Sequence, residues 1–293
     1  MKSFSEKLLS LDCCSLTSLE EEQLKLIIDI FADQVDEHLQ NQLLSELMDR
    51  YADMSRQLEE KNQALNIYNV HLEELVRDKV YEISASQIAT IHALVKAAES
   101  RDDDTGAHIE RTASYCKLIA DKLWDAGLYP DDVDFFYAEN IEKASPLHDI
   151  GKIGIADAIL LKPGRLTPEE FEIMKTHVLK GYETLASVAK YYPSNTFLKF
   201  GMEISLYHHE KWDGSGYMSG LSREDIPLSA RIMAVSDVYD ALRSKRVYKE
   251  AFSHEKSIGI IAEGRGSHFD PVLIDVFMKD HTLFRDIYDR LTL

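Results

Sequence analysis

The first hundred residues of the chain contain neither glycine nor proline. The first glycine is Gly106 and the first proline is Pro130. Because these two residue types interrupt helices, their absence over so long a stretch predicts helical structure there. Cysteine is also scarce, with three in 293 residues, two of them adjacent. An odd count with an adjacent pair predicts no disulfide framework and is typical of a reducing compartment, so we expect a cytoplasmic protein.

Basic residues and long apolar runs are scarce as well. The sequence has 33 Lys and Arg against 51 Asp and Glu, a formal net charge of -18. Such an acidic surface repels nucleic-acid phosphates, so we expect no role in coating DNA or RNA. A small anionic substrate stays compatible, because bound metal ions reverse the local charge. No stretch reaches the roughly 18 apolar residues of a membrane span, and the start lacks a signal-peptide pattern.

Apolar residues recur in heptads between residues 41 and 95. One series has leucine or tyrosine every seven residues, and a second fills most of the matching fourth positions, with Lys61 as the polar break. The two series are Leu44, Tyr51, Leu58, Leu65 and Leu72, and Leu47, Met54, Tyr68 and Leu75. This spacing is typical of a coiled coil, and we favour a parallel homodimer that transmits a signal. The alternative is a long helix packed on its own domain.

The composition divides the chain into three parts. We predict a short helical region over residues 1–40, a long coiled-coil helix over 41–95 and a globular domain over 96–293. In this third part strand-like alternation stays scarce, and helical runs dominate. They cover residues 109–126, 133–148, 168–191, 197–209, 228–243 and 270–278. We therefore expect an all-α fold, a helical bundle preceded by a long N-terminal helix, with loops at 151–165 and 211–227.

Histidine and aspartate recur across these predicted helices in a pattern that indicates a metal centre. Two doublets stand out, His148-Asp149 and His208-His209. Helical bundles assemble metal sites from side chains on facing helices, and three further candidates lie on separate predicted helices. They are His108, His177 and Asp237. Imidazole and carboxylate together suit divalent iron, manganese or zinc, and the carboxylate of the first doublet is placed to bridge two ions.

Two neighbouring metal ions predict a definite chemistry. Ions about 3.5–4 Å apart clamp a phosphate and lower the pKa of a water between them, which provides hydroxide at neutral pH. They also stabilise the charge that develops in the transition state. The seven residues therefore indicate a phosphohydrolase core that cleaves a phosphodiester.

At this point the motifs resemble a known family. HDIGKIGI, at 148–155, resembles the HD signature, and HHEKWDGSGYMSGL, at 208–221, resembles the extended HD-GYP signature HHExxDGxGYPxGL. The flanking segments agree over about residues 96–278. They are RDDDTGAHIER at 101–111, KTHVLKGYETL at 175–185, IPLSARIMAVSDVYDAL at 226–242 and GSHFDPVL at 266–273. The HD-GYP family consists of bacterial phosphodiesterases that hydrolyse cyclic di-GMP.

The resemblance implies roles for individual residues. It assigns the seven histidines and aspartates as metal ligands, with Asp149 as the catalytic bridge. Lys152 matches a catalytic lysine that contacts the substrate phosphate, and Tyr217 matches the tyrosine of the GYP triplet. Arg246 and Lys249 match residues that engage the phosphates or guanine of the substrate. The resemblance also implies two divalent ions, iron or manganese by preference, and an N-terminal helix that receives input from a sensor or receiver partner.

Two departures from the family pattern bear on these expectations. Met218 replaces the proline of the GYP triplet, which frees φ and leaves the loop more mobile without removing a ligand. Asp104 stands where many relatives have glutamate, four residues before His108 and on the same helical face. It is either a ligand of a third metal or an N-terminal cap. A third metal favours cleavage through linear pGpG to GMP, whereas two metals favour stopping at pGpG, and both outcomes stay open.

Two alternatives to a cyclic di-GMP phosphodiesterase remain. One is a hydrolase of another cyclic dinucleotide, cyclic GMP-AMP, because guanine contacts cannot be deduced from sequence spacing. The other is a degenerate module that senses a nucleotide or binds a partner without turnover. The complete ligand set favours an enzyme, since a pure binding module needs no seven metal ligands and a phosphate-contacting lysine.

Overall fold

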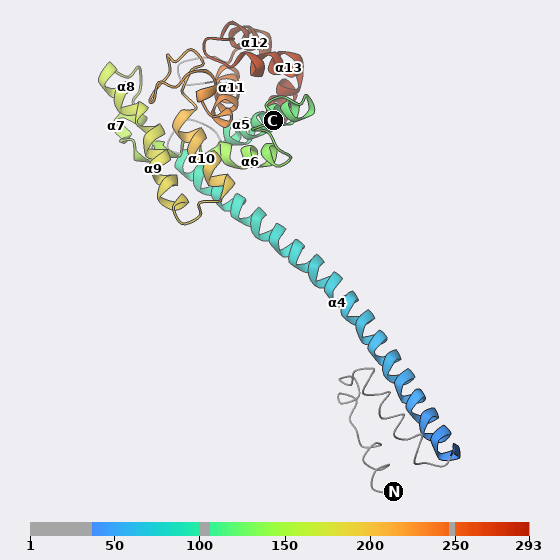
Figure 1. The fold of residues 1–293 in the computed structure, drawn as a ribbon. Coiled ribbons are helices and arrows are strands. Elements are labelled where there is room, and N and C mark those ends of the chain that lie inside the picture. Colours follow the sequence, from blue (N-terminus) through green and yellow to red (C-terminus); the bar gives the residue numbers. More distant parts are fainter. Residues whose placement is uncertain (1–36, 100–105, 246–249, 293) are drawn as a thin grey trace. The chain divides into compact units, whose positions relative to one another are not determined.

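The computed structural model describes residues 37–99, 106–245 and 250–292 (Figure 1). Within these ranges all regular structure is helical, apart from an isolated β-bridge between Arg265 and Phe269. The α-helices are α4 (Glu37–Glu99), α5 (Gly106–Asp125), α6 (Tyr137–Ala144), α7 (Asp157–Leu160), α8 (Pro168–Lys175), α9 (His177–Ala189), α10 (Thr196–Tyr207), α11 (Leu228–Arg243), α12 (His254–Glu263) and α13 (Pro271–Thr292). Short 3₁₀ helices are η1 (Ser145–Leu147), η2 (Ile150–Gly154) and η3 (Arg223–Asp225). The all-α prediction is confirmed.

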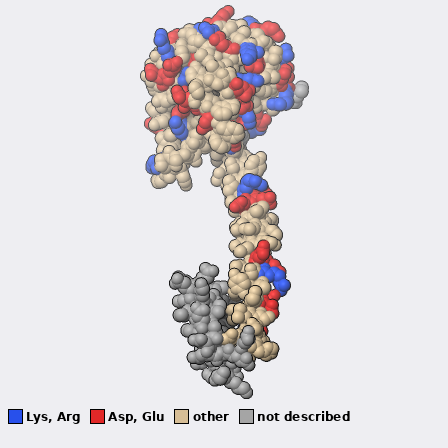
Figure 2. Space-filling view, turned by 45° about the vertical axis from the view of Figure 1, so that its right-hand side comes forward, with Lys and Arg blue, Asp and Glu red and all other residues tan. Residues whose placement is uncertain are grey.

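The chain divides into two compact units, residues 1–84 and 85–293. Most of α4 lies in the first unit, and its 63 residues form one continuous helix, which confirms the predicted long N-terminal helix. Its heptad leucines are exposed, with Leu58 at 60% and Leu65 at 56% of their full accessibility. Figure 2 shows stretches of uncharged side chains between the charged groups of this helix. Among the described residues, the helix therefore presents exposed apolar side chains.

Helix α11 forms the centre of the second unit. Most of its residues are buried, as expected of a helix surrounded by others. Helices α5, α6, α10, α12 and α13 contribute the rest of the main core, in which the rings of Tyr115, Tyr239, Phe277 and Phe284 pack together. A smaller cluster joins Val95 at the end of α4 to Ile109 in α5. Both clusters hold α5 in place, so its early turns are firmly positioned.

Two glycines let three elements of the second unit approach closely. A Cβ on Gly151, in η2, would lie 1.9 Å from the carbonyl oxygen of His177, at the start of α9. A Cβ on Gly181, in α9, would lie 2.1 Å from the Oγ of Ser205 in α10. Since real Cβ atoms do not approach a backbone oxygen so closely, only glycine fits at position 151, and a larger residue at position 181 would require the Ser205 side chain to move. These contacts bring η2, α9 and α10 to one place.

The helices differ from the sequence prediction in several places. The predicted run 133–148 is α6 followed by η1, the run 168–191 is divided into α8 and α9, and the predicted loop at 211–227 contains η3. The sequence does not predict α12, because Gly259 and several isoleucines interrupt the helical pattern, although Ser253 caps its start by accepting the N–H of Lys256. Helix α13 continues past the predicted end at residue 278, through a kink at Asp280, because Phe284 is still buried. The predicted loop at 151–165 contains the rest of η2 and the single turn of α7.

The surface of the second unit carries charge of both signs. Figure 2 shows acidic and basic side chains interspersed over the face in view. Among the described residues no helix is both long and apolar enough to cross a membrane.

Candidate metal centre

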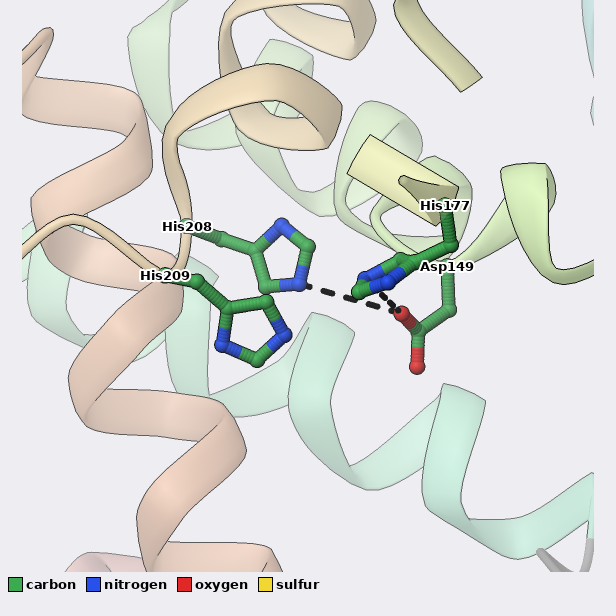
Figure 3. Close-up of side chains that lie close together, drawn as sticks. All are labelled: Asp149, His177, His208 and His209. Atoms are coloured by element: carbon green, nitrogen blue, oxygen red, sulfur yellow. Dashed lines mark ion pairs between the residues drawn. The ribbon is translucent and has the colours of Figure 1, made fainter. Parts of the chain in front are cut away.

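The structure brings the seven predicted ligand residues together in two groups. The first contains Asp149, His177, His208 and His209, and is drawn in Figure 3. The second contains His108, His148 and Asp237. Within each group every residue offers one ligand atom, and these atoms all lie within 4.8 Å of one another. The sequence prediction therefore found residues that are far apart in the chain and adjacent in space.

Most of these side chains stand at helix ends. His148 and Asp149 lie between η1 and η2, and His177 is the first residue of α9. His208 and His209 follow directly after α10. The remaining two lie within α5 and α11, which the core holds. The His148-Asp149 doublet is divided between the two groups, whereas His208 and His209 both belong to the first.

Asp149 lies between the two groups. Its Oδ1 is 3.1 Å from Nε2 of His177 and 3.7 Å from Nε2 of His208, the two contacts dashed in Figure 3. Its Oδ2 is 3.4 Å from Nε2 of His148, in the second group, and 2.8 Å from Nζ of Lys152. The two oxygens of one nearly buried carboxylate thus face different groups.

The ring protons of three histidines are placed by the backbone. Nδ1 of His148, His177 and His208 lies 3.0, 2.8 and 2.9 Å from a backbone carbonyl oxygen three or four residues earlier. A carbonyl only accepts, so Nδ1 carries the proton and Nε2 carries a lone pair. Nε2 of His177 and of His208 therefore points its lone pair toward Oδ1 of Asp149, and none of these three buried atoms has a hydrogen-bond partner among the described residues. Converging acceptors of this kind fit a bound cation.

The pKa values of Asp149, His208 and His209 favour the deprotonated forms that metal binding requires. Burial would raise the pKa of Asp149, but the positive charge of Lys152, with smaller contributions from the neighbouring histidines, outweighs it and holds that pKa well below the usual range. Burial, with His209 nearby, holds the pKa of His208 well below its usual value. Burial also lowers the pKa of His209 to about 4. At neutral pH the site therefore presents lone pairs and a carboxylate charge, which suits a divalent ion.

Comparison with known proteins places this site in a family. Residues 131–273 match the HD domain family, a range that contains all the candidate ligands except His108 and the possible third-metal ligand Asp104. Over 220 residues the chain is 49% identical to a probable cyclic di-GMP phosphodiesterase of Vibrio cholerae, which covers 75% of this chain and 50% of that protein. The chain belongs to the HD-GYP family. HD-domain phosphohydrolases are metal-dependent, in keeping with the two ligand groups.

Other relatives differ in the substrate that their names give. A cyclic di-GMP phosphodiesterase of Thermotoga maritima is 38% identical over 219 residues, which are 75% of this chain and 56% of that protein. The 3'3'-cGAMP-specific phosphodiesterase 2 of Vibrio cholerae is 36% identical over 223 residues, 76% of this chain and 40% of that protein. The chain spans about half the length of the curated relatives it matches.

Two of the residues that the HD-GYP resemblance assigns to substrate lie beside the candidate metal ligands. Lys152 contacts Asp149, as described above, and is partly exposed. The ring of Tyr217 stacks on His209, with ring centroids 4.8 Å apart and planes 26° from parallel. Nζ of Lys175 lies 5.5 Å from the centroid of the Tyr217 ring. Asp104, Arg246 and Lys249 lie outside the described residues, so their roles stay predictions.

Glu210 accepts hydrogen bonds from the loop that carries the GYM variant of the HD-GYP triplet. The sequence prediction gave this residue no role. Glu210 is buried, and its Oε1 accepts the backbone N–H of Ser219 at 2.6 Å and of Gly220 at 3.0 Å. Met218 is 44% exposed, and its peptide bond to Tyr217 is cis. Glu210 follows the second histidine doublet directly, so the same turn positions two candidate ligands and the loop.

Sequence reasoning also missed a charged network behind His108. Nδ1 of His108 lies 2.8 Å from Oδ2 of Asp240, and Arg111 donates to both oxygens of that carboxylate, at 2.6 and 2.8 Å. Burial lowers the pKa of His108, but the hydrogen bond and charge of Asp240 outweigh it, so that pKa is raised overall. A signal existed in the sequence: Arg111 follows His108 by three residues, and Asp240 follows Asp237 by three, the spacing of one helical face.

Proposed function

We propose that this HD-GYP protein is a metal-dependent phosphodiesterase that hydrolyses cyclic di-GMP to linear pGpG, with GMP as a further product if a third ion binds. The observation that carries the proposal is the position of Asp149, whose two carboxylate oxygens face two separate groups of ligand atoms. A carboxylate so placed suits two ions that act together on one phosphodiester. The names of relatives at 38–49% identity support the substrate.

The residues present fit two divalent ions. His177, His208, His209 and Asp149 would hold one, and His108, His148 and Asp237 would hold the other, with Asp149 shared between them. Bound there, the ions supply Lewis-acid stabilisation of the phosphate charge and a strong nucleophile at neutral pH. Imidazole-rich sites with carboxylates suit iron or manganese, which we propose as the native metals. A third ion would need the predicted role of Asp104.

Side chains next to the ligands have the chemistry to hold the substrate. The ammonium of Lys152 lies at the edge of the site and would neutralise a phosphate oxygen, a role for which a compact point charge is suited. The ring of Tyr217 offers a face for a base and a hydroxyl for a hydrogen bond. Arg246 and Lys249, as predicted from the resemblance, would add cationic contacts to phosphate or guanine. These cations matter because the chain as a whole carries a net charge of -18.

Substrate preference distinguishes the main proposal from its alternative. A relative named as 3'3'-cGAMP-specific, 36% identical, makes cyclic GMP-AMP the second candidate. We expect metal-loaded protein to convert cyclic di-GMP to linear product with a kcat/KM at least about tenfold above that for 3'3'-cGAMP, since a site that hydrogen-bonds guanine rejects an adenine in its place. Parallel assays of both substrates, with products separated by chromatography, measure the ratio.

Each outcome of this assay decides something. A ratio below one replaces cyclic di-GMP by cyclic GMP-AMP as the substrate. Absence of linear product from either nucleotide, with iron or manganese loaded, contradicts the enzyme and favours the module that binds a nucleotide or a partner without turnover.

We propose further that α4 joins two copies of the chain in a parallel coiled coil. Leu58, Leu65 and Leu72 are exposed along one heptad series, and a second copy is the partner whose stripe matches in length and register. Light scattering should give twice the chain mass of 33.5 kDa. The double substitution of Leu58 and Leu65 by aspartate should give monomers, and the same change at Gln63 and Asn66, outside the heptad series, should leave dimers.

A monomeric wild-type protein contradicts the coiled coil. A dimer that persists in the double leucine variant shows that α4 is not its determinant and favours the packing of this helix on its own chain. A sensor or receiver partner acting through α4, and a cytoplasmic location, stay predictions.

A further inference from the structure

The histidines of the metal centre are oriented by two kinds of acceptor. His148, His177 and His208 direct Nδ1 at backbone carbonyl oxygens. His108 directs Nδ1 at the side chain of Asp240, 132 residues away in the sequence and 2.8 Å away in space. A backbone carbonyl carries a partial charge, whereas a carboxylate carries a full one. A carboxylate acceptor therefore changes the basicity of the histidine ligand as well as the orientation of its ring.

The carboxylate of Asp240 is held as a buried anion. Its side chain is 1% exposed. Arg111 donates Nε–H to Oδ1 at 2.6 Å and Nη2–H to Oδ2 at 2.8 Å. Ser244 donates its hydroxyl to Oδ2 at 3.2 Å. Desolvating such a pair costs several kcal/mol, and apolar residues would fill the space with less loss. A buried charge that is kept despite this cost indicates a functional role, and His108 is the residue on which Asp240 acts.

We propose that Asp240 is the positioning residue of the second ion site, the one formed by His108, His148 and Asp237. Asp240 holds the His108 ring with Nδ1–H donated and the Nε2 lone pair presented to the ion. Its negative charge makes the imidazole a stronger donor, and Arg111 fixes the carboxylate while keeping the buried charge balanced. The proposal rests on the proposed metal centre, and it assigns to Asp240 no contact with substrate.

This arrangement predicts that the two ion sites respond differently to one substitution. In the Asp240→Asn variant (D240N) the shape of the side chain stays and the charge is lost. The ion held with His108 should then bind roughly 10- to 100-fold more weakly, the usual effect of removing an outer partner of a ligand histidine. The ion of the first group, in which His177 and His208 rely on backbone carbonyls and no histidine contacts Asp240, should bind as before. A merely structural residue would not separate the two sites.

Calorimetric titration of manganese into metal-free full-length protein tests this. Wild-type protein should show two ions, and D240N should show one unchanged and one weakened. The matched control is Asp275→Asn, because Asp275 also accepts two bonds from one arginine, Arg265, at 2.8 Å each, but on the surface of α13. Equal weakening of both ions in D240N, or weakening of neither, overturns the proposal. Loss of one ion in the Asp275 variant does so as well.

A measurement on the wild-type protein keeps the proposal testable if D240N fails to fold. With ¹⁵N-labelled histidine and zinc as a diamagnetic ion, NMR reports which ring nitrogen of His108 carries the proton, assigned by the signal lost in His108→Gln. A protonated Nδ1 and a bare Nε2 are expected, and the opposite tautomer overturns the proposal. Both tests read metal binding without substrate. If cyclic dinucleotides are not hydrolysed but D240N still weakens the binding of one ion and not of the other, the proposed function fails and this inference stands.

Discussion

Asp149→Ala is expected to abolish metal loading and turnover together. The side chain is the one that faces both ligand groups, with Oδ1 toward His177 and His208 and Oδ2 toward His148. Alanine leaves the histidine lone pairs without the shared anion. Losing the ions removes several kcal/mol of transition-state stabilisation, so the rate should fall by roughly a thousandfold or more. Metal analysis of anaerobically purified protein and a product assay measure the two effects.

Two variants separate this result from general damage. Lys152→Ala should retain metal and weaken the handling of substrate, because Nζ contacts Asp149 without belonging to either ligand group. Asp131→Ala, at an exposed position before α6, should change neither property. Normal metal content and normal activity in the Asp149 variant would show that the site is wrongly assigned.

Arg231→Met should lower the free energy of unfolding by about 3–5 kcal/mol, the usual cost of removing one member of a buried ion pair. Arg231 donates Nη1–H to Oδ2 of Asp270 at 2.6 Å and Nε–H to the carbonyl oxygen of Ile226 at 2.9 Å. Asp270 is fully buried and also accepts the hydroxyl of Tyr129. Methionine keeps most of the packing but leaves that carboxylate with less compensation. Equilibrium denaturation in urea, with a two-state fit, measures the change.

The same arginine restrains the loop that carries Tyr217, because the Ile226 carbonyl ends that loop and the ring of Trp212, at its beginning, lies 5.8 Å from the guanidinium carbon. The matched control is Arg265→Met, which removes an exposed pair and should barely alter stability. An Arg231 variant as stable as the wild type would contradict this prediction. It would mean that the buried Arg231–Asp270 pair does not stabilise this part of the fold.

The helical fold was predictable because helices leave local signals. The absence of glycine and proline before Gly106 is such a signal, and α4 follows it over 63 residues. Helix α12 was not predicted, because Gly259 and its isoleucines weaken the local helical pattern. The helix is instead stabilised by burial of Ile261 against the core. Tertiary packing outweighs local propensity there.

The grouping of the candidate metal ligands was predictable for a different reason. Histidine and aspartate doublets are chemically distinctive, so His148-Asp149 and His208-His209 could be recognised without knowing where they lie. Asp240 and Glu210 are carboxylates of a common type, and their roles depend on partners that only the fold brings near. The roles of Gly151 and Gly181 could not be predicted either, because the close approach of η2, α9 and α10 exists only once the three elements pack. Sequence patterns report ligands better than the residues that position them.

The most direct test of the metal-dependent phosphodiesterase is a titration of metal-depleted protein. Manganese is added stepwise in the presence of cyclic di-GMP, and the linear product is quantified by chromatography at each step. The two ligand groups predict no product in the metal-free protein and product that rises with loading until both groups are filled. Product formation that is independent of metal, or none at full loading, would contradict the account.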